Sequence, residues 1–230
     1  AYGIAALDAV TTGDGNTAIG NGSLSGSNTG VENTAIGKAA MNVSTSASYN
    51  VAIGNSAGAA MTTGDLYNTL VGHSSGAAIT SGNRNVFLGT SSGDGFDTET
   101  HNVGVGVASL GGPIAGGEYN VGVGNYTLDA LTSADFVTAV GYDAGGAITS
   151  GGYNTLIGHT AGHDMTSGNV NTAVGHHALG TNTVGDRNVA VGSGALSTFN
   201  PSSNTDDNNT AVGYGALNAL TTGVHNIAIG

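Results

Sequence analysis

The pentapeptide NTAIG at residues 16–20 returns unchanged at 33–37, and close variants stand at 50–54 (NVAIG) and at 226–230 (NIAIG). The pattern is Asn, then Thr or Val, a small residue, Ile or Val, and Gly, and it recurs along all 230 residues. The motif glycines are Gly20, Gly37, Gly54, Gly72, Gly89, Gly106, Gly124, Gly141, Gly158, Gly175, Gly192, Gly213 and Gly230. Nine of the intervals between them are 17 residues, two are 18 and one is 21. A fixed period of this kind indicates a repeat architecture.

Each motif is too short for a helix, and its β-branched residues favour a strand, whose side chains alternate between two faces. We assign the apolar residue before each glycine, with the Thr or Val two places earlier, to the core of the coil. The residues before the glycines are Ile19, Ile36, Ile53, Val71, Leu88, Val105, Val123, Val140, Ile157, Val174, Val191, Val212 and Ile229. The aligned Thr residues are Thr17, Thr34, Thr69, Thr138, Thr155, Thr172 and Thr210.

The middle residue of the motif lies on the opposite face and is small in most repeats, with Leu70, Phe87 and Leu156 as exceptions. A strand with one solvated face should carry polar residues there, and this one does not. We therefore expect the second face to meet another chain. Its small residues are Ala18, Ala35, Ala52, Gly104, Gly122, Ala139, Ala173, Ala190, Ala211 and Ala228.

A compensating pattern follows the motif. The fourth residue after the motif glycine is mostly either Leu or Met, or else Gly. Where it is Gly, the residue three places further on is large and apolar, which predicts one core position filled from either of two backbone sites at roughly constant volume. The glycines are Gly58, Gly76, Gly93, Gly145 and Gly162, and the apolar residues are Met61, Ile79, Phe96, Ile148 and Met165.

These patterns predict an all-β fold, a β-solenoid of about 13 coils of 17–18 residues. The period continues through residues 1–230, so we expect a single repeat domain, and the chain reads as a piece of a longer fibre. The one long interval predicts an insertion loop at 197–207, near Pro201.

Composition excludes several functions. The net charge is −12 with only three Lys and Arg residues, which disfavours nucleic acid and anionic membranes, and no apolar run is long enough to span a bilayer. There is no Cys, and no nucleophile elbow, zinc-binding or phosphate-binding motif. We predict no enzyme and no catalytic, cofactor-binding or metal-binding residues, because so regular a chain offers few places for a cleft.

The strands at 16–20, 33–37, 50–54 and 226–230 resemble the head repeats of YadA-type trimeric autotransporter adhesins, which carry an SVAIG-like strand in each coil, and similar repeats of phage tail fibres. The resemblance covers essentially the whole chain. It implies a left-handed parallel β-roll with three chains wound about a common axis. The period is longer than in the adhesin heads, and the chain shows no stalk, membrane anchor or chaperone domain.

Three sets of side chains are candidate surface sites. In seven consecutive coils, the residue before the motif Asn is planar, so these groups could stack as a ladder that either binds sugars or seals the rim of the core. They are Tyr49, Tyr67, Arg84, His101, Tyr119, Phe136 and Tyr153. His73, His159 and His176 follow the motif glycine in a mostly polar column, which reads as solvent-facing, although an axial position would create metal-binding triplets in a trimer.

Acidic residues gather in the turn before the motif Asn. We expect a solvated negative edge that opposes lateral aggregation, with Ca²⁺ binding as the alternative. The residues are Asp14, Glu32, Asp65, Glu99, Glu118, Asp135, Asp186, Asp206 and Asp207.

We therefore expect a structural or adhesive fibre segment, the repeat shaft or head of an extracellular trimeric adhesin or phage tail fibre. A homotrimer and a cell-surface or matrix receptor are its expected partners. The alternative is an ice-binding or carbohydrate-binding β-solenoid. One aligned Thr per strand is fewer than the paired Thr ranks expected of an ice-binding face.

Overall fold

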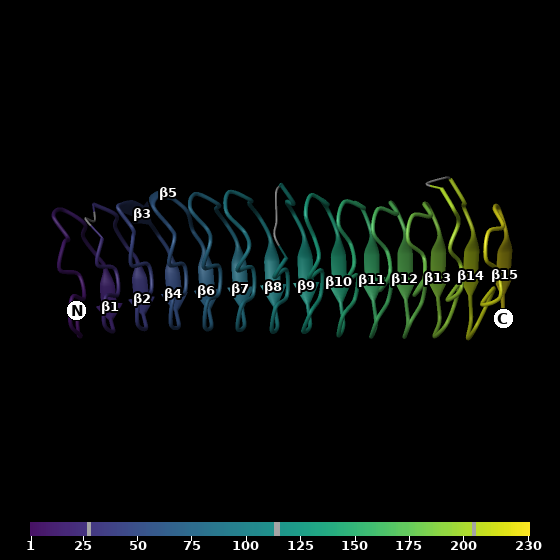
Figure 1. Cartoon of the computed structure of the whole chain (residues 1–230), viewed down its shortest axis with the longest axis horizontal. Helices are drawn as coiled ribbons and strands as arrows, with labels where there is room; N and C mark the ends of the chain where they lie inside the picture. The colour runs from purple at the N-terminus through teal and green to yellow at the C-terminus, as the bar shows by residue number, and fades with distance from the viewer. Residues whose placement is uncertain (27–28, 113–115, 204–205) are drawn as a thin grey trace. The chain divides into compact units, whose positions relative to one another are not determined.

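The computed structural model describes residues 1–26, 29–112, 116–203 and 206–230. The chain divides into two compact units, Ala1–Gly116 and Gly117–Gly230. Each unit is a stack of coils in which one short strand per coil lies beside the strand of the next (Figure 1).

In the first unit, six motif strands pair in parallel in the order β1-β2-β4-β6-β7-β8. Their registers align like motif positions, so that Ala18 lies opposite Ala35. A second, two-stranded sheet joins β3 (Ser46–Ser48) to β5 (Thr63–Asp65). The motif strands are β1 (Thr17–Ile19), β2 (Thr34–Ile36), β4 (Val51–Ile53), β6 (Thr69–Val71), β7 (Val86–Leu88) and β8 (Val103–Val105).

The second unit holds the parallel strands β9 to β15, paired in chain order with the same register. They are β9 (Val121–Val123), β10 (Thr138–Val140), β11 (Thr155–Ile157), β12 (Thr172–Val174), β13 (Val189–Val191), β14 (Thr210–Val212) and β15 (Ile227–Ile229). The predicted all-β parallel solenoid is thus confirmed, with about twelve turns. No helix in the described parts of the chain is long and apolar enough to cross a membrane.

The two faces of the motif strands are the reverse of our expectation. The middle residue is buried in every motif strand from β1 to β14, whereas the residues on either side of it are half-buried or exposed. Ile19 is 43% exposed and Ile157 is 40% exposed, while Ala18 and Leu156 are fully buried. The assignment of Ile, Val and Thr to the core of the coil was therefore wrong, and so was the assignment of the Ala and Gly residues to a neighbouring chain.

The reason is the width of the coil. Large side chains of the same coil and of the neighbouring coil already fill the interior, so most strands have room only for a small residue. A Cβ atom added to Gly104 would lie 2.7 Å from the hydroxyl oxygen of Ser92 and 3.0 Å from the ring of Phe87. Such distances are overlaps in a close-packed interior. The β-branched residues are therefore left on the outside.

The compensating core position is confirmed. Large side chains from both backbone sites are fully buried, Leu24 and Met41 from one and Met61 and Phe96 from the other. Where the first site is glycine, the space above it is occupied: a Cβ atom on Gly58 would lie 2.2 Å from the terminal methyl of Met61.

The motif asparagines form a buried ladder along each stack. The side-chain oxygen of Asn171 accepts a hydrogen bond from the backbone N–H of Asn188 at 2.9 Å, and its NH₂ group donates to the carbonyl of Gly185 at 2.8 Å. Both partners belong to the following coil. At Val137, which replaces Asn, the ladder loses one rung: Val137 donates its N–H to Asn120 but offers no side-chain oxygen to the next coil.

The insertion at 197–207 does not disturb the stack. Strands β13 and β14, on either side of it, pair in register with Ala190 opposite Ala211. Phe199 and Pro201 are buried and anchor the longer coil, whereas Ser202 is exposed.

Candidate functional site

An apolar surface lies on the outer face of the motif strands. We call it the outer strand face, and it consists of the first and third residues of each motif strand. In both units these residues are Thr, Val, Ile or Leu throughout. Parallel sheets are ordinarily covered on both faces, and an exposed apolar patch marks an interaction site. The face can therefore bind a second apolar surface.

Five of the seven predicted members of the aromatic ladder stack, two in the first unit and three in the second. The rings of Tyr49 and Tyr67 stack at 5.0 Å, and Phe136 stacks on Tyr119 and on Tyr153 at 5.1 Å. Each of these residues has a positive φ, so the ring projects from a tight backbone turn at the edge of the coil. The rings are 41% to 63% exposed, which leaves an aromatic surface open to a ligand. Sugar binding there stays a prediction.

The other two members of the ladder, Arg84 and His101, bond to their chain neighbours. Arg84 donates from Nη1 to the side-chain oxygen of Asn83 at 3.2 Å. Nδ1 of His101 lies 2.9 Å from the hydroxyl of Thr100.

The histidine column is exposed, as its polar neighbours predicted: His73, His159 and His176 all lie on the surface. His159 stacks on Tyr142 at 5.3 Å and on His176 at 5.4 Å. Among the residues that the structure describes, no group of three His, Cys, Asp or Glu side chains has a geometry that could hold a metal ion.

Several acidic side chains serve the turns as hydrogen-bond acceptors. Glu99 is buried, and its carboxylate accepts the backbone N–H groups of Asp97, Thr98 and Gly116 at 2.8–3.0 Å. Asp135 accepts the N–H of Glu118 at 2.8 Å. Arg187 forms an ion pair with Asp206. These carboxylates thus join successive coils as well as giving the edge its charge.

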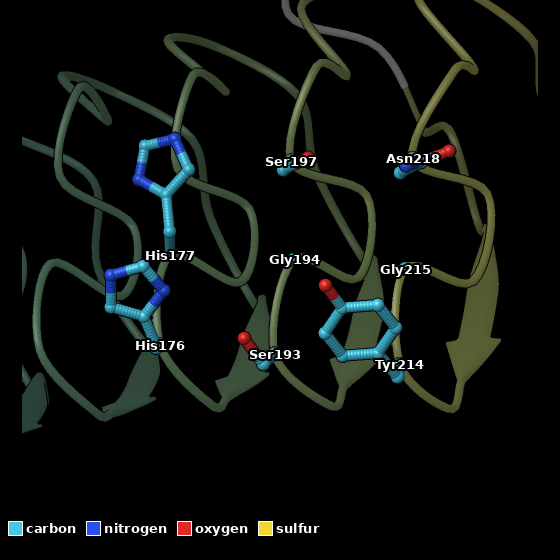
Figure 2. A pocket seen from close by; sticks show the side chains of 8 residues that line it. All are labelled: His176, His177, Ser193, Gly194, Ser197, Tyr214, Gly215 and Asn218. Atoms are coloured by element: carbon cyan, nitrogen blue, oxygen red, sulfur yellow. The ribbon is translucent and has the colours of Figure 1, made fainter.

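A pocket of about 210 Å³ lies in the second unit, on the surface of the coils that begin at β12, β13 and β14 (Figure 2). Its lining comprises His176, His177, Ser193, Gly194, Ser197, Tyr214, Gly215 and Asn218. No Lys, Arg, Asp or Glu is among these residues, so the pocket combines aromatic rings with neutral polar groups.

Sequence reasoning missed this pocket. A signal was present, because the second residue after the motif glycine carries a side chain in most coils but is glycine at Gly194 and Gly215 in succession. A search of this position for consecutive glycines would have located the pocket.

The chain was compared with protein-family models, with curated proteins and with solved structures, and none of the three comparisons gives a match.

Proposed function

We propose that this chain is a structural and adhesive fibre segment that assembles as a homotrimer through its outer strand face. The observation that carries the proposal is that, in each unit, Ile, Val and Thr on one face of a parallel sheet are half-buried or exposed and have no described layer of the same chain packed over them. Three copies that shared one axis would cover this face. The similarity of the repeats to those of trimeric adhesins and tail fibres supports a left-handed β-roll and this subunit number.

The fibre role is supported by the regularity of the coils. Within each unit, successive coils hydrogen-bond through their strands and, except after Val137, through the asparagine ladder, so stress along the stack is shared by many equivalent bonds. Such a stack suits a spacer that holds a binding surface away from its base, on a cell surface or on a virion. Its partners would be two further copies and a surface or matrix receptor. The acidic surface disfavours nucleic acid and membrane lipids.

The assembly is tested by light scattering on the wild type and on Ile157→Asp, which places a charge on the outer strand face. We expect the mass of three chains for the wild type and a loss of the trimer in the variant, because a buried unpaired charge is costly. Ser202→Asp, on the exposed part of the insertion, is the control and should keep the trimer. A wild type that is monomeric at micromolar concentration would contradict the proposal.

Ice binding is a second candidate, and the structure gives it a specific observation. The aligned threonines Thr138, Thr155 and Thr172 lie on the outer strand face, alternating with Val or Ile. Their assignment to the core no longer holds, although one Thr per strand is still fewer than the paired ranks expected of an ice-binding face. Thermal hysteresis separates the two functions, since a trimer would cover the face that ice requires. We expect none.

A further inference from the structure

The pocket in the second unit interrupts a row of stacked rings. We call the residues that follow the motif glycines the ring column. In successive coils it reads Tyr142, His159, His176, Ser193 and Tyr214. The first three rings stack at 5.3 and 5.4 Å. Ser193 then takes the place of a ring, and Tyr214 follows it, 89% exposed.

The spacing of the coils fixes the size of this gap. Gly194 donates its N–H to the carbonyl of His176 at 2.9 Å, and Gly215 donates to that of Ser193 at 2.9 Å, so the three coils are in regular contact. Parallel strands lie about 4.8 Å apart, which separates the backbone positions of His176 and Tyr214 by about 9.6 Å. Aromatic groups pack at centroid distances of about 4.5–7 Å. The gap therefore has room for one further ring.

The floor of the gap is bare backbone. The residue that follows the ring column is Thr160 or His177 in the preceding coils, but it is glycine, Gly194 and Gly215, in the two coils of the pocket. A Cβ atom added to Gly194 would meet nothing within 4 Å, and one on Gly215 would meet only Asn218, at 3.5 Å. Both glycines have positive φ. The pocket is smaller than the roughly 300–1,000 Å³ typical of drug-sized ligands, which also points to a single-ring guest.

Polar groups surround this floor. The hydroxyls of Ser193 and Ser197 and the side-chain amide of Asn218 all line the pocket, and within the described part of the chain none of them has a hydrogen-bond partner. Together they offer both donors and acceptors. With no charged Lys, Arg, Asp or Glu in the lining, the chemistry suits a neutral guest with several hydroxyl groups.

We propose that this pocket binds one neutral pyranose ring of a saccharide, seated between His176 and Tyr214. The C–H faces of the sugar would pack on the aromatic side chains, and its hydroxyls would bond to Ser193, Ser197 and Asn218. The site shares no residue with the outer strand face, so it does not depend on how the chain assembles. It goes beyond the fibre function by giving the segment a ligand of its own.

The test is saturation-transfer NMR on the intact chain with a panel of methyl pyranosides of glucose, galactose, mannose and N-acetylglucosamine. At least one should receive saturation, mainly on its ring C–H protons. Tyr214→Ala should weaken that binding about tenfold, the order of one aromatic contact. Ser193→Tyr should abolish it, since the new ring fills the gap. Tyr142→Ala, in the same column but away from the pocket, should leave binding unchanged.

A second arm distinguishes a free sugar from the terminal residue of a glycan. Immobilised oligosaccharides that end in the responding ring should bind with greater avidity than the monosaccharide if the target is a glycan, and no better if it is a free sugar; either result supports the site. The proposal fails if no sugar of the panel is saturated, or if Tyr214→Ala and Ser193→Tyr bind like the wild type. Light scattering on each variant separates such a failure from a failure to assemble.

Discussion

Leu156 and Ile157 are neighbours in β11 and nearly equal in size, yet Leu156 is fully buried and Ile157 is 40% exposed. One points into the coil, the other onto the outer strand face. In a narrow coil, a large side chain can point inward only where the opposite wall leaves space. At Leu156 this space exists because residue 162 is glycine: a Cβ atom on Gly162 would lie 2.8 Å from Leu156 Cδ2. Hydrophobicity alone therefore does not identify the inner face of a thin solenoid.

The largest expected effect sharpens this comparison. Leu156→Asp should lower the free energy of unfolding by about 4 kcal/mol or more, because it removes a buried side chain and buries an unpaired charge. Ile157→Asp should cost about 1 kcal/mol within the coil, because its charge keeps contact with water. Urea unfolding measures both, at a protein concentration at which light scattering shows each variant to be monomeric. Equal losses would mean that the two faces are equivalently buried.

A smaller difference is expected between two glycines, one inside the coil and one outside. Gly162→Ala should destabilise by about 2–4 kcal/mol, since its methyl group collides with Leu156 and alanine resists a φ of +59°. Gly194→Ala carries only the backbone cost, about 1 kcal/mol, since nothing lies within 4 Å of the new methyl. Thermal unfolding followed by circular dichroism compares them. If Gly194→Ala is the more destabilising of the two, the space around Gly194 is not open as described.

The smallest effect is expected at the insertion. Ser202 is exposed, so Ser202→Asp should change the free energy of unfolding by less than about 0.5 kcal/mol. It serves as the baseline for the other variants in the same urea titration. A loss comparable to that of Leu156→Asp would show that Ser202 is buried in the core.

The repeat made most of the fold predictable. The period gave the coils, the β-branched motif gave the strands, and the alternation between Leu or Met and Gly gave the shared core position confirmed at Met61 and Phe96. The sequence pattern did not show which face of each motif strand points into the coil. It depends on how much volume the opposite wall supplies, and a pattern such as Thr-Ala-Ile has apolar or small groups on both sides.

Some of the candidate sites could be predicted from the sequence and others could not. The stacks of Tyr49 with Tyr67 and of His159 with His176 follow directly from equal positions in consecutive coils. The acceptor role of Glu99 was not predictable, since two of its N–H partners lie in its own turn and the third, Gly116, lies in the following coil, and the sequence does not specify how those turns meet. The pocket depends on absent side chains at Gly194 and Gly215, which a search for chemically active residues passes over.

The asparagine ladder favours folding of the coils in order, from the N-terminus to the C-terminus. The side-chain oxygen accepts from the coil that follows: Asn154, for example, accepts the N–H of Asn171 at 2.8 Å. Its NH₂ group donates to the carbonyl of Gly168 at 2.7 Å, also in that coil, and to the carbonyl of Gly151 in its own coil at 3.0 Å. A folded coil thus presents a correctly placed donor and acceptor before the next coil has been synthesised. Translation proceeds in that same direction, so every newly made coil can dock on a completed template while the rest of the protein is still being synthesised.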